Sequence, residues 1–210
     1  MTCALCNTRR PRRFCPGVRG EICTLCCGKE REETIDCPLD CEFLQEAHRH
    51  EKPAALQPTD MPEPDIRVSE EFLREHETLI ILFSRALLDS ASEIPGVTDE
   101  DARQALACLV RTFRTLQSGL IYESRPENPF AAHIYSSVQE LVGKLRSAEK
   151  RTGGVQRIRD AEFLGVFVFL LRMEVAQRNG RKRSRAFLTF LRSAVGAPSS
   201  SQDQPSLLVP

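Results

Sequence analysis

The sequence lacks residues and patterns that are typical of several large functional classes. It contains no tryptophan and only two tyrosines in 210 residues, so few rings are available for stacking on nucleic-acid bases. Its 29 basic and 29 acidic side chains give a formal net charge of zero, which argues against a generally basic nucleic-acid-binding protein. The longest strongly apolar run, Phe163 to Leu171, is nine residues long, whereas a membrane-spanning helix needs about 20.

Recognisable leader and catalytic motifs are missing as well. Residues 1–7 lack the apolar core of roughly 7–15 residues that a secretory signal peptide requires. We therefore expect a soluble, cytoplasmic protein without a membrane partner, whose thiols stay reduced. The sequence has no G-x-S-x-G, glycine-rich phosphate loop or H-E-x-x-H motif, so we expect no catalytic residues and no enzymatic activity.

Cysteine, in contrast, is abundant and concentrated at one end. Eight of the nine cysteines lie between Cys3 and Cys41, and Cys108 stands alone. Two C-x2-C pairs let thiolates converge on one metal, and the adjacent residues Cys26 and Cys27 point opposite ways if extended, so they suit two metals. We predict two zinc ions, the first bound by Cys3, Cys6, Cys23 and Cys26, and the second by Cys15, Cys27, Cys37 and Cys41.

The energetics of a short segment support metal binding independently. Residues 1–45 hold few large apolar side chains, and segments this small usually need metal or disulfides to fold. With eight thiolates saturating two ions, the expected role of the metal is structural. Iron–sulfur ligation, a disulfide framework and a redox-active Cys23-x-x-Cys26 remain alternatives. His48 and His50, just past the last cysteine, are interpreted as solvated linker residues.

The cysteine pattern resembles interleaved zinc modules such as RING, B-box, MYND and HIT-type fingers, over residues 3–41 only. The nearest likeness is to the HIT-type finger, through Cys3-x2-Cys6, Phe14-Cys15-Pro16 and Ile22-Cys23-Thr24-Leu25-x-Cys27. The chain departs from that finger at Val18, where a second cysteine is usual, and in lacking histidine ligands before residue 48. As a whole, the sequence also looks like uncharacterised bacterial proteins with a zinc-binding head and a helical body.

The remainder of the chain is typical of an all-α bundle of about five helices. Apolar side chains recur at helical spacing in five segments, namely 70–90, 98–120, 129–145, 160–178 and 184–195. The apolar stripe of the second segment runs from Ala102 to Leu120. Thr98 and Asp101 form a capping-box pattern, and the fourth segment, apolar nearly all round, is expected to be the most buried. Up-down topology is expected. The predicted organisation is a small, irregular zinc-binding module (1–47), a proline-rich linker (48–68), the bundle (69–195) and a disordered tail (196–210).

Charge is segregated along the chain although its sum is zero. Residues 51–101 carry a net charge of −9 and residues 102–210 a net charge of +9. The first hypothesis for function is a zinc-stabilised interaction or adaptor protein with a protein partner. The alternative is a nucleic-acid-binding regulator that grips phosphates through two basic clusters, Arg9, Arg10, Arg12 and Arg13 in the head and Arg181, Lys182, Arg183 and Arg185 in the body.

Overall fold

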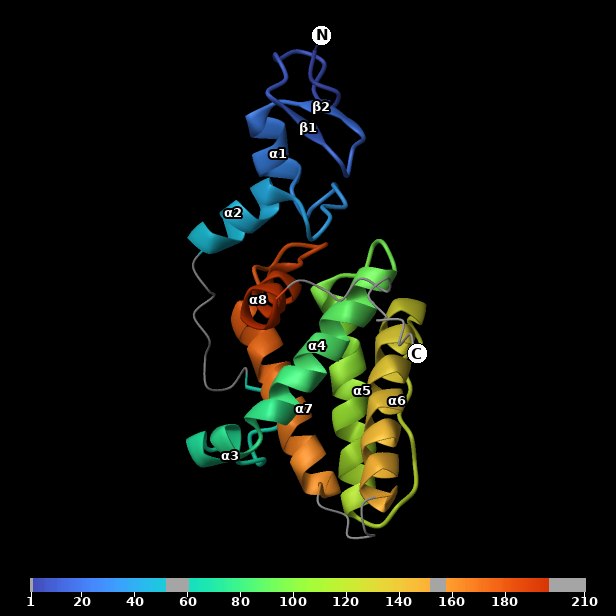
Figure 1. The fold of residues 1–210 in the computed structure, drawn as a ribbon. Coiled ribbons are helices and arrows are strands. Elements are labelled where there is room, and N and C mark those ends of the chain that lie inside the picture. Colours follow the sequence, from blue (N-terminus) through green and yellow to red (C-terminus); the bar gives the residue numbers. More distant parts are fainter. Residues whose placement is uncertain (1, 52–60, 152–157, 197–210) are drawn as a thin grey trace, which may run out of the picture.

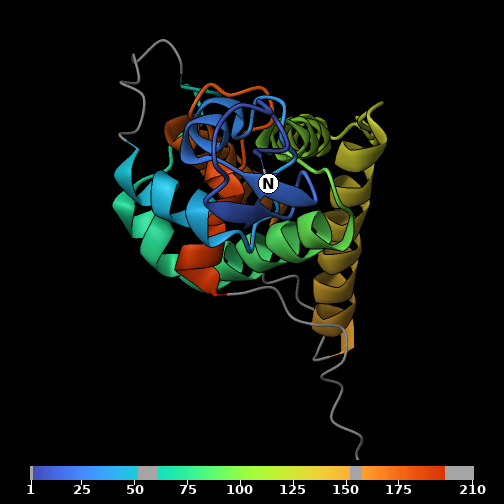
Figure 2. The same cartoon turned by 90° about the horizontal axis from the view of Figure 1, so that it is seen from above.

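A computed structural model describes residues 2–51, 61–151 and 158–196 of the chain. A small head stands at one end of a larger helical body (Figure 1). Seen from above, the head covers the end of the body rather than its side (Figure 2). The central part of the predicted linker, the Gly153-Gly154 stop and nearly all of the predicted disordered tail lie outside the described residues.

The head contains regular structure, although the sequence suggested an irregular one. It consists of β1 (Arg13–Cys15), β2 (Gly20–Ile22), α1 (Thr24–Glu30) and α2 (Glu42–His50). The strands form an antiparallel hairpin in which Arg13 pairs with Ile22. Ile22, Ile35 and Leu44 are buried with five of the cysteines in a core that belongs to the head alone. Helix α2 runs past residue 47, so the first residues of the predicted linker are helical.

The body has six helices among its described residues, one more than predicted. They are α3 (Glu70–Glu75), α4 (Glu77–Glu93), α5 (Asp99–Gln117), α6 (Pro129–Arg151), α7 (Asp160–Gln177) and α8 (Ala186–Val195). The predicted first helix is divided at His76 because the chain turns there and lays the ring of Phe72 against α7 at Gly165. A side chain on Gly165 would clash with that ring, since an added Cβ would lie 2.4 Å from it.

The capping prediction is confirmed and one core prediction is wrong. The backbone N–H of Thr98 donates to the Asp101 carboxylate at 2.8 Å, and the reciprocal bond of the capping box is also present. Helix α5 ends at Gln117, so Leu120, which the periodicity placed on the apolar stripe, lies beyond the helix and is 63% exposed. No helix in the described part of the chain has the length and apolarity needed to cross a membrane.

Helix α7 forms the centre of the body, as its nearly uniform apolarity predicted. Its rings pack with those of α4 and α5 at centroid distances between 5.0 and 5.8 Å, through Phe83, Phe113, Phe163 and Phe167. Helix α5 packs on α6 and α7, whereas α4 crosses the bundle diagonally and packs mainly on α6 and α8 (Figure 1). The order is therefore not a simple up-down one in which each helix packs mainly on the next.

Candidate metal centre

The structure brings together the first predicted tetrad in the outer part of the head. Cys3 and Cys6 lie in a turn closed by a hydrogen bond from the Asn7 N–H to the Cys3 carbonyl at 2.9 Å. Cys23 is the N-cap of α1, and its sulfur accepts the N–H of Cys26 at 3.5 Å. Turn and helix start therefore face each other, and the four sulfur atoms all lie within 4.8 Å of one another.

Hydrogen bonds favour the thiolate form of two members of this tetrad, Cys3 and Cys6. The Thr8 hydroxyl, together with backbone N–H groups, lowers the pKa of Cys6 to about 5. Backbone hydrogen bonds, chiefly from Cys6 itself, also lower the pKa of Cys3. The pKa of Cys26 is instead raised to about 12, because its thiol is hydrogen-bonded to the neighbouring Cys23 sulfur and is desolvated. Four adjacent thiols cannot all lose their protons unless a cation lies among them, because like charges repel. The four sulfurs together therefore favour a bound metal ion.

The tetrad fits one zinc ion. Thiolates about 2.3 Å from a tetrahedral zinc would lie roughly 3.8 Å apart, so sulfurs already within 4.8 Å need only small movements. The ligands of a multi-iron cluster attach to different irons and therefore stand further apart than the ligands of a single ion. All nine cysteines are free thiols rather than disulfides. The geometry accordingly supports a single ion bound by four protein ligands.

The second predicted tetrad is only partly assembled. Its four members line one small cavity beneath the hairpin, Cys15, Cys27, Cys37 and Cys41. No three of their sulfurs lie within 4.8 Å of one another, however. The Arg31 guanidinium contacts the Cys27 sulfur at 3.8 Å, and burial raises the pKa of Cys37 to about 11. The second zinc ion stays a prediction.

The basic cluster of the head is divided between inward and outward roles. Arg9 lies against the first tetrad, where a hydrogen bond with Cys23 raises the pKa of the guanidinium. Arg13 stacks on the ring of Phe43, with its guanidinium carbon 3.9 Å from the ring centroid. Arg10 and Arg12 are exposed. Within this cluster of four, Arg10 and Arg12 are therefore the arginines that project freely into solvent.

The second basic cluster lies at the junction between head and body, where it holds the two together. Arg181 donates to the carbonyl of Arg31 at 2.7 Å. The buried guanidinium of Arg185 donates to the carbonyl of Val97 at 2.7 Å, contacts the Cys37 carbonyl and pairs with Asp36 at 2.7 Å. Lys182 is exposed, while the backbone N–H of Arg183 donates to the Glu32 carbonyl at 2.8 Å. The two inward-facing arginines are thus engaged with protein atoms.

Sequence reasoning missed the centre of this junction, the carboxylate of Glu32. It is fully buried and accepts hydrogen bonds from His48 and Asn179 at 2.9 Å each, and from the backbone N–H of Arg185. Burial raises the pKa of Glu32, but these hydrogen bonds outweigh it and the net shift is downward. The interpretation of His48 as a solvated linker residue was wrong, since its side chain is only 7% exposed.

Glu32, His48 and Glu51 also form a group whose ligand atoms lie within 4.8 Å of one another. The Glu32 oxygens already have protein donors, so this group is a weaker metal candidate than the cysteine tetrad. No sequence signal pointed to this group, because His48 and Glu51 lie together at the end of α2 and Glu32 meets them only through the fold.

No protein-family model, no curated protein and no solved structure matches this chain. The likeness to interleaved zinc fingers therefore rests on the cysteine pattern and on the assembled tetrad.

Proposed function

We propose that the protein is a non-enzymatic, zinc-binding adaptor of the cytoplasm, in which structural zinc folds the head and the head docks a protein partner. The observation that carries this proposal is the four-sulfur cluster within 4.8 Å in a head whose own core is small. Metal binding supplies folding free energy to such segments. Four protein ligands also complete the zinc coordination, which leaves no open position for a substrate.

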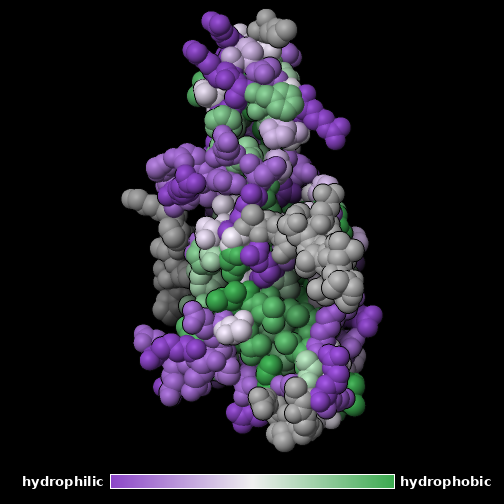
Figure 3. Space-filling model, viewed as in Figure 1, coloured by the Kyte–Doolittle hydropathy of each residue, from purple (hydrophilic) through white to green (hydrophobic). Residues whose placement is uncertain are grey.

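The outer surface of the head supplies the docking face. Leu5 and Leu25, 37% and 63% exposed, line a shallow depression beside Cys6 and Cys26. Phe14, the middle residue of β1, is 57% exposed. Apolar side chains appear at the surface of the head in Figure 3. A small rigid module that displays large apolar side chains around its metal is typical of a protein-interaction surface.

Variants that change the surface without touching the ligands test the adaptor role. We expect Leu5→Asp/Leu25→Asp protein to keep its zinc, measured by elemental analysis, and to lose the partners that wild-type protein retains in affinity capture from the native cell. Ile81→Asp, at a 50% exposed site on α4, serves as the matched control and should retain them. An unchanged set of partners in the double variant would contradict docking through this face, and absence of zinc from wild-type protein would contradict the metal role.

The alternative, nucleic-acid binding, has lost part of its basis. Arg181 and Arg185 are bound to protein groups, which leaves Arg10 and Arg12 as the main exposed cations of the two clusters together with Lys182. This hypothesis predicts salt-sensitive gel shifts that weaken in Arg10→Ala/Arg12→Ala protein. Gel shifts that are absent or that do not depend on salt concentration would contradict nucleic-acid binding.

A further inference from the structure

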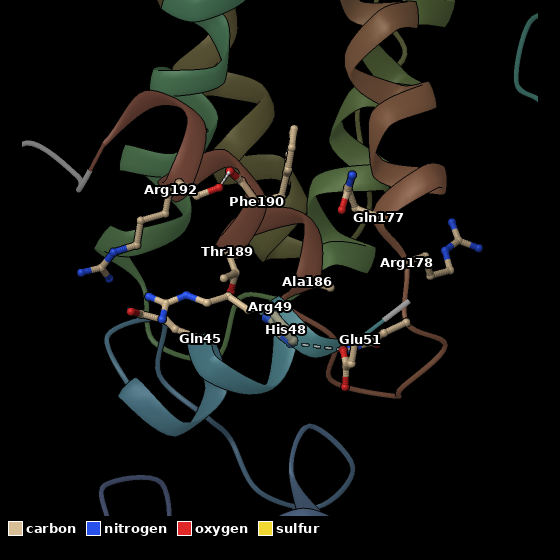
Figure 4. Close-up of a pocket in the computed structure, with 12 residues that line it drawn as sticks. Gln45, His48, Arg49, Glu51, Gln177, Arg178, Ala186, Thr189, Phe190 and Arg192 are labelled. Atoms are coloured by element: carbon tan, nitrogen blue, oxygen red, sulfur yellow. Dashed lines mark hydrogen bonds and ion pairs between the residues drawn. The ribbon is translucent and has the colours of Figure 1, made fainter. Parts of the chain in front are cut away.

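A cavity of about 370 Å³ lies where the head meets the body. Figure 4 shows α2 on one side of it and α8, with the end of α7, on the other. His48 and Glu51 line it from the head, and Thr189 and Phe190 line it from the body. The volume falls in the range of small-molecule sites, and junctions between structural units are common places for them.

Two of the residues that line this cavity each carry a buried polar atom without a protein partner among the described residues. The Nδ1 atom of His48 and the Oγ1 atom of Thr189 are inaccessible to solvent and accept or donate no hydrogen bond within the described residues. The other ring nitrogen of His48 bonds the Glu32 carboxylate, which fixes the ring, and in the neutral ring Nδ1 is then an acceptor. A buried polar group without a partner is unfavourable because it has lost its water without gaining a hydrogen bond, so both atoms favour a ligand that supplies the missing bonds.

The cavity carries charged side chains on both sides. Arg49 of α2 and Arg192 of α8 lie on the same side of it, as Figure 4 shows, and Glu51 and Arg178 lie on the other. Arg49 pairs with the exposed Glu46, whereas no described residue pairs with the guanidinium of Arg192. Phe190 adds an apolar wall between these ends.

We propose that this junction cavity binds a small organic anion that also carries a hydroxyl or amine group. Its anionic group, a carboxylate or a phosphate, lies between Arg49 and Arg192, its donor group bonds His48 Nδ1, and its apolar part rests on Phe190. Thr189 Oγ1, which both donates and accepts, completes the polar contacts. This site is separate from the zinc centre and does not depend on the adaptor role.

Calorimetric titration of the zinc-loaded full-length protein tests the proposal. The probes are inorganic phosphate, ribose 5-phosphate, adenosine 5′-monophosphate and 4-hydroxybenzoate. We expect at least one organic probe to bind with a Kd below about 1 mM, and inorganic phosphate to bind more weakly. Arg192→Gln should weaken that binding roughly tenfold or more, because a charged hydrogen bond is lost. Arg10→Gln, an exposed arginine on the head, is the control and should bind as the wild type does.

Thr189→Val separates ligand binding from a purely structural role. The hydroxyl has no protein partner, so its replacement by a methyl of similar shape should leave the ligand-free protein at least as stable in thermal unfolding. The same variant should bind the organic probe more weakly. Absence of binding by all three organic probes overturns the proposal, and so does binding that is unchanged in both Arg192→Gln and Thr189→Val.

Discussion

Glu32 adopts a backbone conformation that its residue type rarely takes. Its φ is +54°, in the left-handed region where glycine is the usual residue. The fold tolerates this strain because the conformation directs a buried carboxylate at three donors from two distant parts of the chain, His48, Asn179 and Arg185. Glycine at position 32 would remove the backbone strain but also all three hydrogen bonds. The need for the carboxylate therefore explains why glutamate occupies this position.

Replacement of Glu32 by glutamine should destabilise the protein by about 3 kcal/mol. The amide keeps the size and the backbone strain but removes the charge, and its NH₂ group faces at least one of the existing donors. Urea unfolding of zinc-loaded protein measures the change. Glu21→Gln, on the exposed side of β2, is the control and should change stability by less than about 0.5 kcal/mol. Equal stabilities for the two variants would show that the Glu32 network is not stabilising.

Residues whose spacing along the sequence forms a recognisable motif were predictable, whereas residues that meet only through tertiary contacts were not. Two C-x2-C pairs pointed to Cys3, Cys6, Cys23 and Cys26, which the structure brings together. Glu32 and His48 are 16 residues apart and meet only because α2 folds back beside the end of α1. Likewise, a basic run such as 181–185 indicates cations but not whether they face solvent or the carbonyl groups of a neighbouring unit.

At the scale of elements, α8 depends on a cap that comes from another helix. Its first N–H groups receive no side-chain bond from its own N-cap residue, Arg185. The carboxylate of Asp99, at the start of α5, accepts the N–H of Phe187 at 3.0 Å and that of Leu188 at 3.1 Å, and bonds the Ser184 hydroxyl at 2.6 Å. Local capping rules identified the Thr98 box but could not show a cap supplied from 88 residues away.

Removal of this shared cap should loosen α8. We expect Asp99→Ala to cost about 3 kcal/mol, because two buried N–H groups and a hydroxyl lose their acceptor at once. Hydrogen exchange should show the loss of protection concentrated in α8. Glu100→Ala, the neighbouring residue on the exposed face, is the matched control. Uniform exchange across the body in the Asp99 variant would contradict a local capping role.

The same carboxylate predicts a pH dependence with a defined sign. Burial raises the pKa of Asp99 above its value in the unfolded chain. Its favourable contribution is therefore fully present below the unfolded pKa of about 3.9 and is lost as pH rises through the folded pKa. The wild type should lose stability relative to Asp99→Asn as the pH is raised through this window. Because both proteins keep the same cysteines, the difference in their unfolding free energies removes the effect of zinc release, and a difference that is constant with pH would contradict the prediction.

At the scale of the whole molecule, head and body have separate apolar cores joined by a polar junction. The head core is built from cysteines and three aliphatic residues, whereas the body core includes the phenylalanine cluster around α7. The contacts between them include hydrogen bonds and ion pairs of Glu32, Arg181 and Arg185. Leu39 of the head also packs against the body core. We therefore expect the head to depend on a metal for folding and the body to fold without one, and we expect the junction to transmit part of the stability of one to the other.

Loss of the zinc site should unfold the head and weaken the body without abolishing it. We expect Cys6→Ser protein to contain less zinc by elemental analysis, to keep most of its helical circular dichroism, and to melt roughly 6–12 °C lower, since about 3 kcal/mol of junction contacts is lost at 2–4 °C per kcal/mol. Cys108→Ala, the cysteine of the body core, tests whether any cysteine change has this effect and should retain zinc. Loss of most of the helical signal in Cys6→Ser would mean that head and body fold as one cooperative unit. An unchanged melting temperature would mean that the junction network of Glu32 transmits no stability from the metal centre to the helices.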